Sequence, residues 1–369
     1  MGTIAVVAIE NLDANNIAKL MYCFRDALQE HKESLNSLNV YPVPDGDTGS
    51  NMTATLNSVV SEIESLEDPE FENIIEAISH GSLMGARGNS GVIISQILRG
   101  FVSEIKNASK KTIDANLFSD ALRAAASAAY EAVGNPVEGT ILTVVRETAE
   151  AAEKSLLEHS NLLLVAETAR EAAKRSLDST PDLLPVLARA GVVDAGGSGF
   201  LLMLDSLLHV IDDRPMPEPE IVKASVDSLI LDIHDDTTNS GTRYEVMYFL
   251  DAPDDLIPGF KKAWSEIGDS IVVVGGENIW NCHVHTNNIG AVVEAGISIG
   301  KPHDIRVTDL FEEIAENHHE QDHADPIGCS VIAVSNGEGI GDIFRSLGAT
   351  RVVNGGQSMN PSTADLLEA

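Results

Sequence analysis

Apolar residues recur every three or four positions along most of the first 210 residues, separated by short polar stretches. This spacing predicts amphipathic helices whose apolar faces pack against one another. Clear examples cover residues 117–133, which are dense in alanine, 161–177 and 198–210. Pro136 stands where a further helical turn could start ahead of residues 141–148. Strand signals are weak in this part, so we expect residues 1–211 to form an all-α domain.

The pattern changes after about residue 226, where short β-prone runs replace the helical spacing. These runs cover residues 229–233, 244–250, 271–274 and 279–285, with helical patterns at 258–267 and 290–299. Strands mixed with helices in this way predict an α+β domain over residues 221–312. Connectors rich in proline or acidic residues, 212–220 and 313–326, flank this domain.

A third region begins after the second connector. A strand at 328–335, a helix near 340–347 and a strand at 350–353 predict the start of an α/β domain over residues 326–369. Because one β-α-β unit cannot close a sheet of useful size, we expect only part of that domain here. The predicted architecture is therefore multidomain, with an all-α domain followed by an α+β domain and the start of an α/β domain.

The chain is strongly acidic, and this excludes some kinds of partner. It has 57 Asp and Glu residues against 24 Lys and Arg, a formal net charge of −33. A basic surface for nucleic acid or an anionic membrane is therefore not expected. No apolar run of 18 residues is present, so we expect no transmembrane segment. Cys23, Cys282 and Cys329 are odd in number and far apart, which is typical of reduced thiols in the cytoplasm.

The stretch NVYPVPDGDTGSNM at residues 39–52 carries the strongest signal for chemistry. Asp45 and Asp47 lie on either side of a glycine, so a tight turn can bring two carboxylates to one hard cation. The spacing excludes an EF-hand, because the sixth loop position is not glycine. The alternative is a capped turn with solvated aspartates. The residues that offer N-caps and backbone N–H groups to a phosphate at the following helix are Thr48, Ser50 and Asn51.

Three further glycine-bearing stretches precede predicted helices: GSLMGARGNSG at 81–91, GNPVEGTILT at 134–143 and GVVDAGGSG at 191–199. Glycine lets the backbone wrap closely around a phosphate, and the helix dipole favours the anion. Neither a Walker loop nor a dinucleotide fingerprint is present. Arg87 either contacts a phosphate or covers the surface beside a helix end. Together with residues 39–52 there are four glycine-bearing helix starts, and one shared rim that binds a nucleotide with magnesium accounts for all of them.

Taken together, these motifs resemble a known family. LNVYPVPDGDTGSNM, GSLMGARGNSGVIISQ, NPVEGTILTV and AGVVDAGGSGF occur in this order over residues 10–210 and look like the kinase domain of the dihydroxyacetone kinase L-subunit type. More closely, the chain resembles the ATP-binding subunit of bacterial fatty acid kinase, because HVHTNN at 283–288 and GGQSMNPST at 355–363 resemble its later domains. Members are usually longer, so we expect this chain to stop early in the C-terminal domain.

The resemblance implies an α-helical barrel that holds ATP at its open end through Mg²⁺. Asp45 and Asp47 match catalytic, metal-binding aspartates, and Asn39 lies near a third metal position. The implied reaction transfers the γ-phosphoryl group to a fatty acid carboxylate presented by a separate fatty-acid-binding protein, and it gives an acyl phosphate. A homodimer is also implied. The residues expected at the nucleotide are Thr48, Asn51, Met52, Gly88, Asn89, Ser90, Gly91, Thr140, Asp194 and Gly196.

Two other functions stay open from the sequence. The first is a small-molecule kinase subunit of the dihydroxyacetone type, although the domains after residue 210 have no role in that system. The second is a non-catalytic ATP-binding regulatory scaffold, which the short third domain keeps open because it leaves little to dock an acceptor protein.

His283 and His285 stand two positions apart on a predicted strand and therefore point to the same face, the spacing that two zinc ligands need. Cys282 points to the opposite face. In the relatives that the chain resembles, a cysteine on an earlier strand completes a zinc site, and Glu245 stands at that position here. Either Glu245 binds Zn²⁺ through oxygen, or no metal binds and hydrogen bonds satisfy the histidines. We expect a solvated polar run at the connector histidines His318, His319 and His323.

Overall fold

The computed structural model describes residues 9–219, 242–312 and 332–335, positions 340 and 344, and residues 351–354. The chain forms two compact units, Met1–Ile314 and Ala315–Ala369. The predicted strand at 229–233, the connector at 313–326 and the three histidines of that connector lie outside the described residues.

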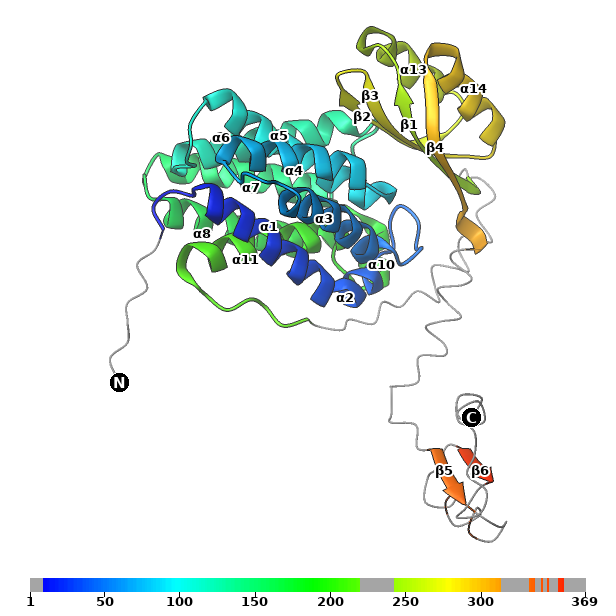
Figure 1. Cartoon of the computed structure of the whole chain (residues 1–369), viewed down its shortest axis with the longest axis horizontal. Coiled ribbons are helices and arrows are strands. Elements are labelled where there is room, and N and C mark those ends of the chain that lie inside the picture. Colours follow the sequence, from blue (N-terminus) through cyan, green and yellow to red (C-terminus); the bar gives the residue numbers. More distant parts are fainter. Residues whose placement is uncertain are drawn as a thin grey trace. The chain divides into compact units, whose positions relative to one another are not determined.

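Helices make up the first part of the larger unit, as the spacing of apolar residues predicts (Figure 1). Asp13, Asp114 and Asn161 each accept a hydrogen bond from a backbone N–H of the following turn, which fixes where their helices begin. The helices are α1 (Ala14–Glu30), α2 (Lys32–Ser37), α3 (Thr48–Glu64), α4 (Phe71–Gly85), α5 (Gly88–Ala108), α6 (Ala115–Ala132), α7 (Ile141–Leu156), α8 (Leu162–Asp178), α9 (Thr180–Leu183), α10 (Pro185–Ala190) and α11 (Ala195–Asp212).

The helix start predicted at Pro136 is wrong. Pro136 lies in the loop before α7, and that helix begins at Ile141. The Thr140 side chain accepts a hydrogen bond from the Leu142 N–H, 3.4 Å away, so a capping residue sets the boundary.

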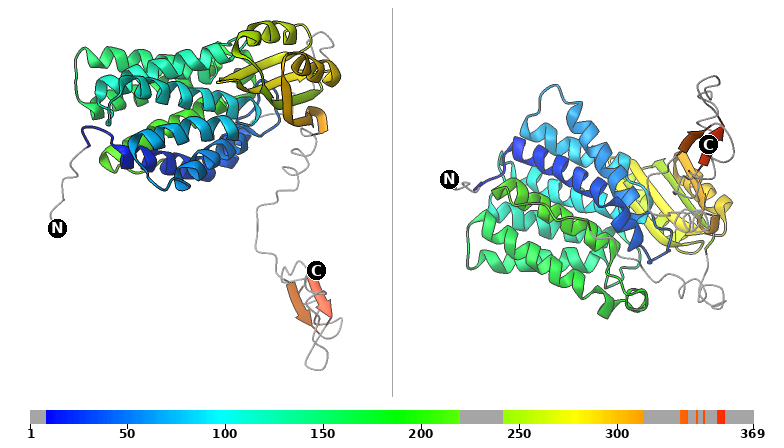
Figure 2. Two further views of the ribbon diagram at one scale, coloured as in Figure 1. Left: turned by 45° about the horizontal axis from the view of Figure 1, so that its top comes forward. Right: turned by 90° about the horizontal axis from the view of Figure 1, so that it is seen from below.

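The longer helices pack side by side (Figures 1 and 2). α1 packs on α3, the contacts continue through α4, α5, α6, α7 and α8, and α11 packs on both α8 and α1. α11 is apolar around most of its circumference, which is typical of a helix enclosed by others. Phe24, Met52 and Phe200 are fully buried among these helices. Burying one such side chain stabilises the fold by about 1.5–3 kcal/mol.

An antiparallel sheet with the strand order β2-β3-β1-β4 follows in the same unit. Its strands are β1 (Tyr244–Asp251), β2 (Asp269–Gly276), β3 (Ile279–Thr286) and β4 (Lys301–Asp309), and its helices are η1 (Asp254–Leu256), α13 (Ile257–Trp264) and α14 (Ile289–Ile299). Val246, Tyr248 and Leu250 of β1 share a core with Phe260 and Trp264 of α13. The sequence did not predict β4, because this edge strand is mostly exposed and its sequence, KPHDIRVTD, has few apolar residues.

The other face of the sheet lies on the helices. Met247, Val272 and Val274 form an apolar cluster with Leu83 and Val92, which belong to α4 and α5. Backbone contacts join the two parts as well, since the Gly134 N–H donates to the Ile271 carbonyl over 3.3 Å. The Asn281 side-chain amide donates to the Leu83 carbonyl over 3.3 Å. These contacts bring residues that are far apart in sequence to the same end of the helices.

In the smaller unit, β5 (Ile332–Ser335) and β6 (Arg351–Asn354) form a parallel pair. Positions 340 and 344 between them are helical. A parallel pair with helical positions between its strands agrees with the β-α-β arrangement that the sequence predicts. The division into domains at 1–211, 221–312 and 326–369 stays a prediction. Within the described ranges, no helix is both long and apolar enough to cross a membrane.

Candidate functional site

The starts of α3, α5, α7 and α11 lie close together, and we call them the helix-start rim. An ideal Cβ built on Gly88 of α5 would overlap the Asn51 side-chain nitrogen and lie 3.5 Å from Asp47 Oδ2, at the start of α3. One built on Gly199 of α11 would meet the Met52 side chain of α3 at 2.6 Å. One built on Gly196 would lie 3.2 Å from the Ile141 side chain of α7. The glycines therefore permit close approach between loops that are distant in sequence.

Asp45 and Asp47, which we call the acid pair, lie at this rim. Asp45 is buried and accepts a hydrogen bond from the Asn39 side-chain amide, while Asp47 accepts one from the Asn51 amide. The pKa of Asp47 is raised, mainly by burial, although a hydrogen bond with Asp45 opposes the shift. Two carboxylates this close need a proton or a cation between them to be stable. The acid pair therefore offers carboxylate oxygens of the kind that a hard metal ion binds.

The expectation that Ser50 and Asn51 offer free backbone N–H groups is wrong. The Ser50 N–H donates to Asn36 Oδ1 over 3.1 Å, and the Asn51 N–H donates to the Asp47 carbonyl over 2.9 Å. Asp47, rather than Thr48, occupies the N-cap position of α3. Asn36 also donates from its amide nitrogen to the Ser50 hydroxyl over 3.1 Å, so it fixes this turn from α2. No sequence signal identified Asn36, because a lone asparagine in a polar stretch is common.

The start of α5 carries a polar group that no protein atom satisfies. The Ser90 Oγ is buried and has no hydrogen-bond partner among the described residues. A buried hydroxyl left in this way costs about 1–3 kcal/mol unless a ligand or water supplies the bond. Asn89 lies beside it, and an ideal Cβ on Gly91 would lie 2.7 Å from the Thr55 hydroxyl, so α5 packs tightly on α3 here. Arg87 is exposed at the N-cap position of α5, and its side chain makes no capping hydrogen bond.

Asp194 caps α11 at the other side of the rim. Its carboxylate is buried and accepts a hydrogen bond of 2.6 Å from the Gly197 N–H. Burial raises the pKa of Asp194 to about 6, although backbone hydrogen bonds from Gly197 and Ile141 oppose the shift. The bond from Ile141 links the start of α7 to that of α11. Thr140, in turn, donates from its hydroxyl to the Val137 carbonyl over 2.8 Å.

We expect Asp194 to make the folded protein more stable as the pH falls from about 6 towards 4. Its pKa is higher in the folded chain than in the unfolded chain, so the folded state binds the proton more tightly over this range. A rise from 3.8 to about 6 corresponds to roughly 3 kcal/mol. Asp194→Asn should remove this part of the pH dependence when the free energy of unfolding is measured by urea titration between pH 4 and 7.

Asp114→Asn is the matched control, because Asp114 is an N-cap whose pKa is shifted the other way. Partial burial alone would raise the pKa of Asp114. Hydrogen bonds from the Leu117 N–H and Lys110 outweigh this effect, so the pKa lies below its usual value. The wild type should therefore lose stability relative to Asp114→Asn as the pH falls through the acidic range. Parallel pH profiles of the wild type and Asp194→Asn would contradict the first expectation.

Glu245, His283 and His285, which we call the His-Glu triad, meet on the sheet face that lies on the helices. Their ligand atoms all lie within 4.8 Å of one another, with Glu245 Oε2 3.8 Å from His283 Nδ1 and 3.7 Å from His285 Nε2. Both ring nitrogens of His283 are buried without a hydrogen-bond partner among the described residues. Burial lowers the pKa of His283 to about 4, which keeps its imidazole neutral. Cys282 lies in the core on the opposite face, as predicted.

The His-Glu triad lies within electrostatic reach of the acid pair. After burial, the charge of Glu245 is the next cause that raises the pKa of Asp47, and His285 lowers it. The sheet therefore brings imidazole and carboxylate groups to the rim that carries the acid pair.

Tyr41 and Asp269 are further residues at this place that the sequence did not single out. The pKa of Tyr41 is raised by burial and then by the charges of Asp194 and Asp269. Tyr41 is part of the stretch that starts at Asn39, so a search of that motif could have found it. Asp269 is one acidic residue among 57 acidic residues and carried no signal.

Comparison with known proteins identifies the family. Residues 42–209 match the DAK2 domain, residues 241–317 the FakA-like middle domain of fatty acid kinase, and residues 330–369 the FakA-like C-terminal domain. The chain is 35% identical to Protein YloV of Bacillus subtilis over 381 residues, covering 98% of this chain and 68% of YloV. It is 35% identical to an uncharacterized protein of Staphylococcus saprophyticus over 377 residues, which cover 98% of this chain and 68% of that protein.

An uncharacterized protein of Staphylococcus aureus is 36% identical over 366 residues, which cover 92% of this chain and 64% of that protein. The chain belongs to the FakA-like family of fatty acid kinase proteins, as its motifs indicate. The DAK2 and FakA-like domains are kinase-related and imply the use of ATP.

Proposed function

We propose that this chain is the ATP-dependent kinase subunit of a two-component fatty acid kinase. It transfers the γ-phosphoryl group of ATP to a fatty acid carboxylate that a separate fatty-acid-binding protein presents, and the product is an acyl phosphate. The observation that carries this proposal is the meeting of the acid pair with the start of α5, where Gly88 leaves no room for a side chain beside Asn51 and Asp47.

In this proposal Asp45 and Asp47 hold Mg²⁺, and Asn39 orients Asp45 or contributes a weaker ligand. The metal ion then offsets the negative charge of the carboxylates beside the phosphates. A protein of net charge −33 needs such a cation to bind an anionic nucleotide. Phosphoryl transfer requires mainly alignment and charge neutralisation, and a carboxylate acceptor is already ionised at pH 7. The nucleotide lies along the helix-start rim, at Thr48, Asn51, Met52, Gly88, Asn89, Ser90, Gly91, Thr140, Asp194 and Gly196.

The His-Glu triad fits Zn²⁺, because two neutral imidazoles and a carboxylate are common zinc ligands. The ring nitrogens of His283 support this assignment, since they have no hydrogen-bond partner among the described residues and a buried ring without one is otherwise costly. A bound zinc ion would supply a Lewis acid beside the phosphate site. Measuring the zinc content of the purified protein tests the assignment. The assignment fails if the wild type holds as little zinc as the double variant that carries Glu245→Gln and His283→Ala.

The arrangement of the helices as a barrel with ATP at its open end belongs to the same proposal. The contacts that run from α1 through α8 to α11 and back to α1 support it. The homodimer, the cytoplasmic location and the three domain boundaries are proposed with it.

Calorimetry of ATP added to the full chain, with MgCl₂ and with EDTA, tests the nucleotide site. We expect binding with magnesium and none with EDTA, and an absence of binding in both would overturn the proposal. The acceptor is then tested by adding the fatty-acid-binding protein loaded with a fatty acid and assaying acyl phosphate. Phosphorylation of dihydroxyacetone instead would favour the small-molecule kinase, and ATP binding without either product would favour a regulatory scaffold.

A further inference from the structure

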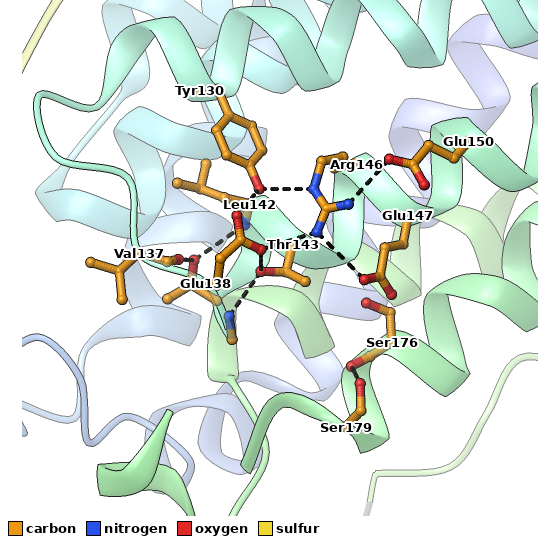
Figure 3. Close-up of polar contacts among 12 residues, drawn as sticks. Tyr130, Val137, Glu138, Leu142, Thr143, Arg146, Glu147, Glu150, Ser176 and Ser179 are labelled. Atoms are coloured by element: carbon orange, nitrogen blue, oxygen red, sulfur yellow. Dashed lines mark hydrogen bonds and ion pairs between the residues drawn. The ribbon is translucent and has the colours of Figure 1, made fainter. Parts of the chain in front are cut away.

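The loop before α7 is held from outside by a network of charged and polar side chains (Figure 3). Arg146 of α7 lies at its centre. Its Nη2 atom lies 3.0 Å from Glu138 Oε2, and its Nε donates to the Tyr130 hydroxyl over 3.2 Å. The Tyr130 hydroxyl donates to Glu138 Oε1 over 2.9 Å. Arg146 and Tyr130 thus hold both carboxylate oxygens of Glu138 in place.

Glu138 passes this restraint to the backbone of the loop. The Thr143 hydroxyl donates to Glu138 Oε2 over 2.7 Å, and the Gly139 N–H donates to the Thr143 hydroxyl over 2.8 Å. Gly139 has a φ of +82°, in the left-handed region that favours glycine. The next residue is Thr140, the N-cap of α7. The chain of contacts from Arg146 therefore ends on the Glu138–Gly139 peptide, one residue before the N-cap of α7.

The network contributes little to global stability. The Arg146 side chain is 38% exposed and the Glu138 side chain 52% exposed. Ion pairs exposed to this extent are worth about 0–1 kcal/mol. The pKa of Arg146 is raised, first by its hydrogen bond to Tyr130, and that of Glu138 is lowered because hydrogen bonds from Thr143, Tyr130 and Arg146 outweigh its burial. Both groups therefore stay charged at neutral pH, and the restraint on the loop persists there.

We propose that Arg146 and Glu138 are positioning residues for the nucleotide, because they hold the Glu138–Gly139 peptide, and with it the adjoining Thr140, in the conformation that presents the start of α7 to a phosphate. This inference rests on the proposed function. The residues themselves do not touch the nucleotide. They act through Thr143 and Gly139, so their loss misplaces Thr140 while the apolar core of the helices stays intact.

Arg146→Gln tests the proposal in the full chain by calorimetry with ATP and MgCl₂. We expect the dissociation constant for ATP to rise about 10-fold or more, since small misplacements of a positioning group are costly. The urea midpoint should stay close to that of the wild type. Arg146→Lys should not restore affinity, because one ammonium group cannot bind Glu138 and Tyr130 in the way that a guanidinium does. The double variant that carries Glu138→Gln and Arg146→Gln should bind ATP no more weakly than Arg146→Gln alone, because both residues act on the same loop.

Glu150→Gln is the matched comparison, because Glu150 accepts from Arg146 Nη1 over 3.1 Å on the side away from the loop. It should leave the affinity for ATP unchanged, as should Arg123→Gln, which removes a surface pair on α6. If the wild type binds ATP and Arg146→Gln binds it equally well, the positioning role is refuted. It is also refuted if Glu150→Gln weakens binding as much as Arg146→Gln does. Absence of ATP binding in the wild type would instead refute the proposed function.

Discussion

Replacing Asp45 and Asp47 together by asparagine is expected to weaken magnesium-dependent ATP binding by at least about 100-fold. Changing a residue that only supports a metal ligand already costs about 10- to 100-fold in affinity, so the loss of two carboxylate ligands should cost more. The measurement is calorimetry with ATP at a fixed, saturating concentration of MgCl₂. The same variant should form no acyl phosphate in the presence of the loaded fatty-acid-binding protein.

The double variant should still fold. Any loss of ATP binding can then be attributed to the missing carboxylates and not to unfolding. Burial raises the pKa of Asp47, which shows that its charge is held at some cost in the folded chain. Neutral amides remove that cost, so the melting temperature should be equal to that of the wild type or higher. Asp120→Asn is the control, since Asp120 is half-exposed on α6 and pairs with Arg123. Unchanged ATP affinity in the double variant would rule out the acid pair as the metal site.

Gly88→Ala is expected to have the second-largest effect, by pushing apart the two loops that meet at the acid pair. Gly88 has a φ of +55°, and an added Cβ would overlap the Asn51 side chain that donates to Asp47. A non-glycine residue in this conformation costs about 1–3 kcal/mol, so the urea midpoint should fall. Because Asn51 and Asp47 must also move, we expect ATP affinity to fall about 10-fold or more at saturating magnesium.

Gly259→Ala gives the matched control for the glycine substitution. Gly259 lies in α13, and apart from the neighbouring helix backbone no heavy atom of the described residues lies within 4 Å of the position where its Cβ would be. Alanine at an open helical position is favourable by up to about 1 kcal/mol, so stability should rise slightly and ATP affinity should not change. Equal ATP affinity in Gly88→Ala and the wild type would show that the meeting of α3 and α5 is unrelated to the nucleotide.

The sequence was most informative where short-range chemistry decides the structure. Apolar spacing predicted the helices of the N-terminal part, and glycines beside capping residues marked the helix starts that gather at the rim. Alternation along β3 placed His283 and His285 on one face and Cys282 on the other, which the structure confirms. These features depend on residues a few positions apart, so a single sequence carries them.

Contacts between distant segments could not be predicted in this way. The link between Asp47 and Glu245 depends on how the sheet lies on the helices, and the restraint of Ser50 by Asn36 depends on how α2 lies beside α3. Periodicity also failed for β4, because an edge strand with one exposed face and few apolar residues has no clear alternation. Tertiary packing, rather than local preference, determines these features.

The hydrogen bond between Asn281 and the Leu83 carbonyl spans 198 positions of the chain, and it has a consequence for the order of assembly. A contact between segments this far apart can form only after the later segment has been synthesised, so the helices can pack together before the sheet docks on them. Before the sheet docks, the acid pair lacks the electrostatic influence of Glu245 and His285. The complete site is therefore assembled only once the sheet has docked on the helices.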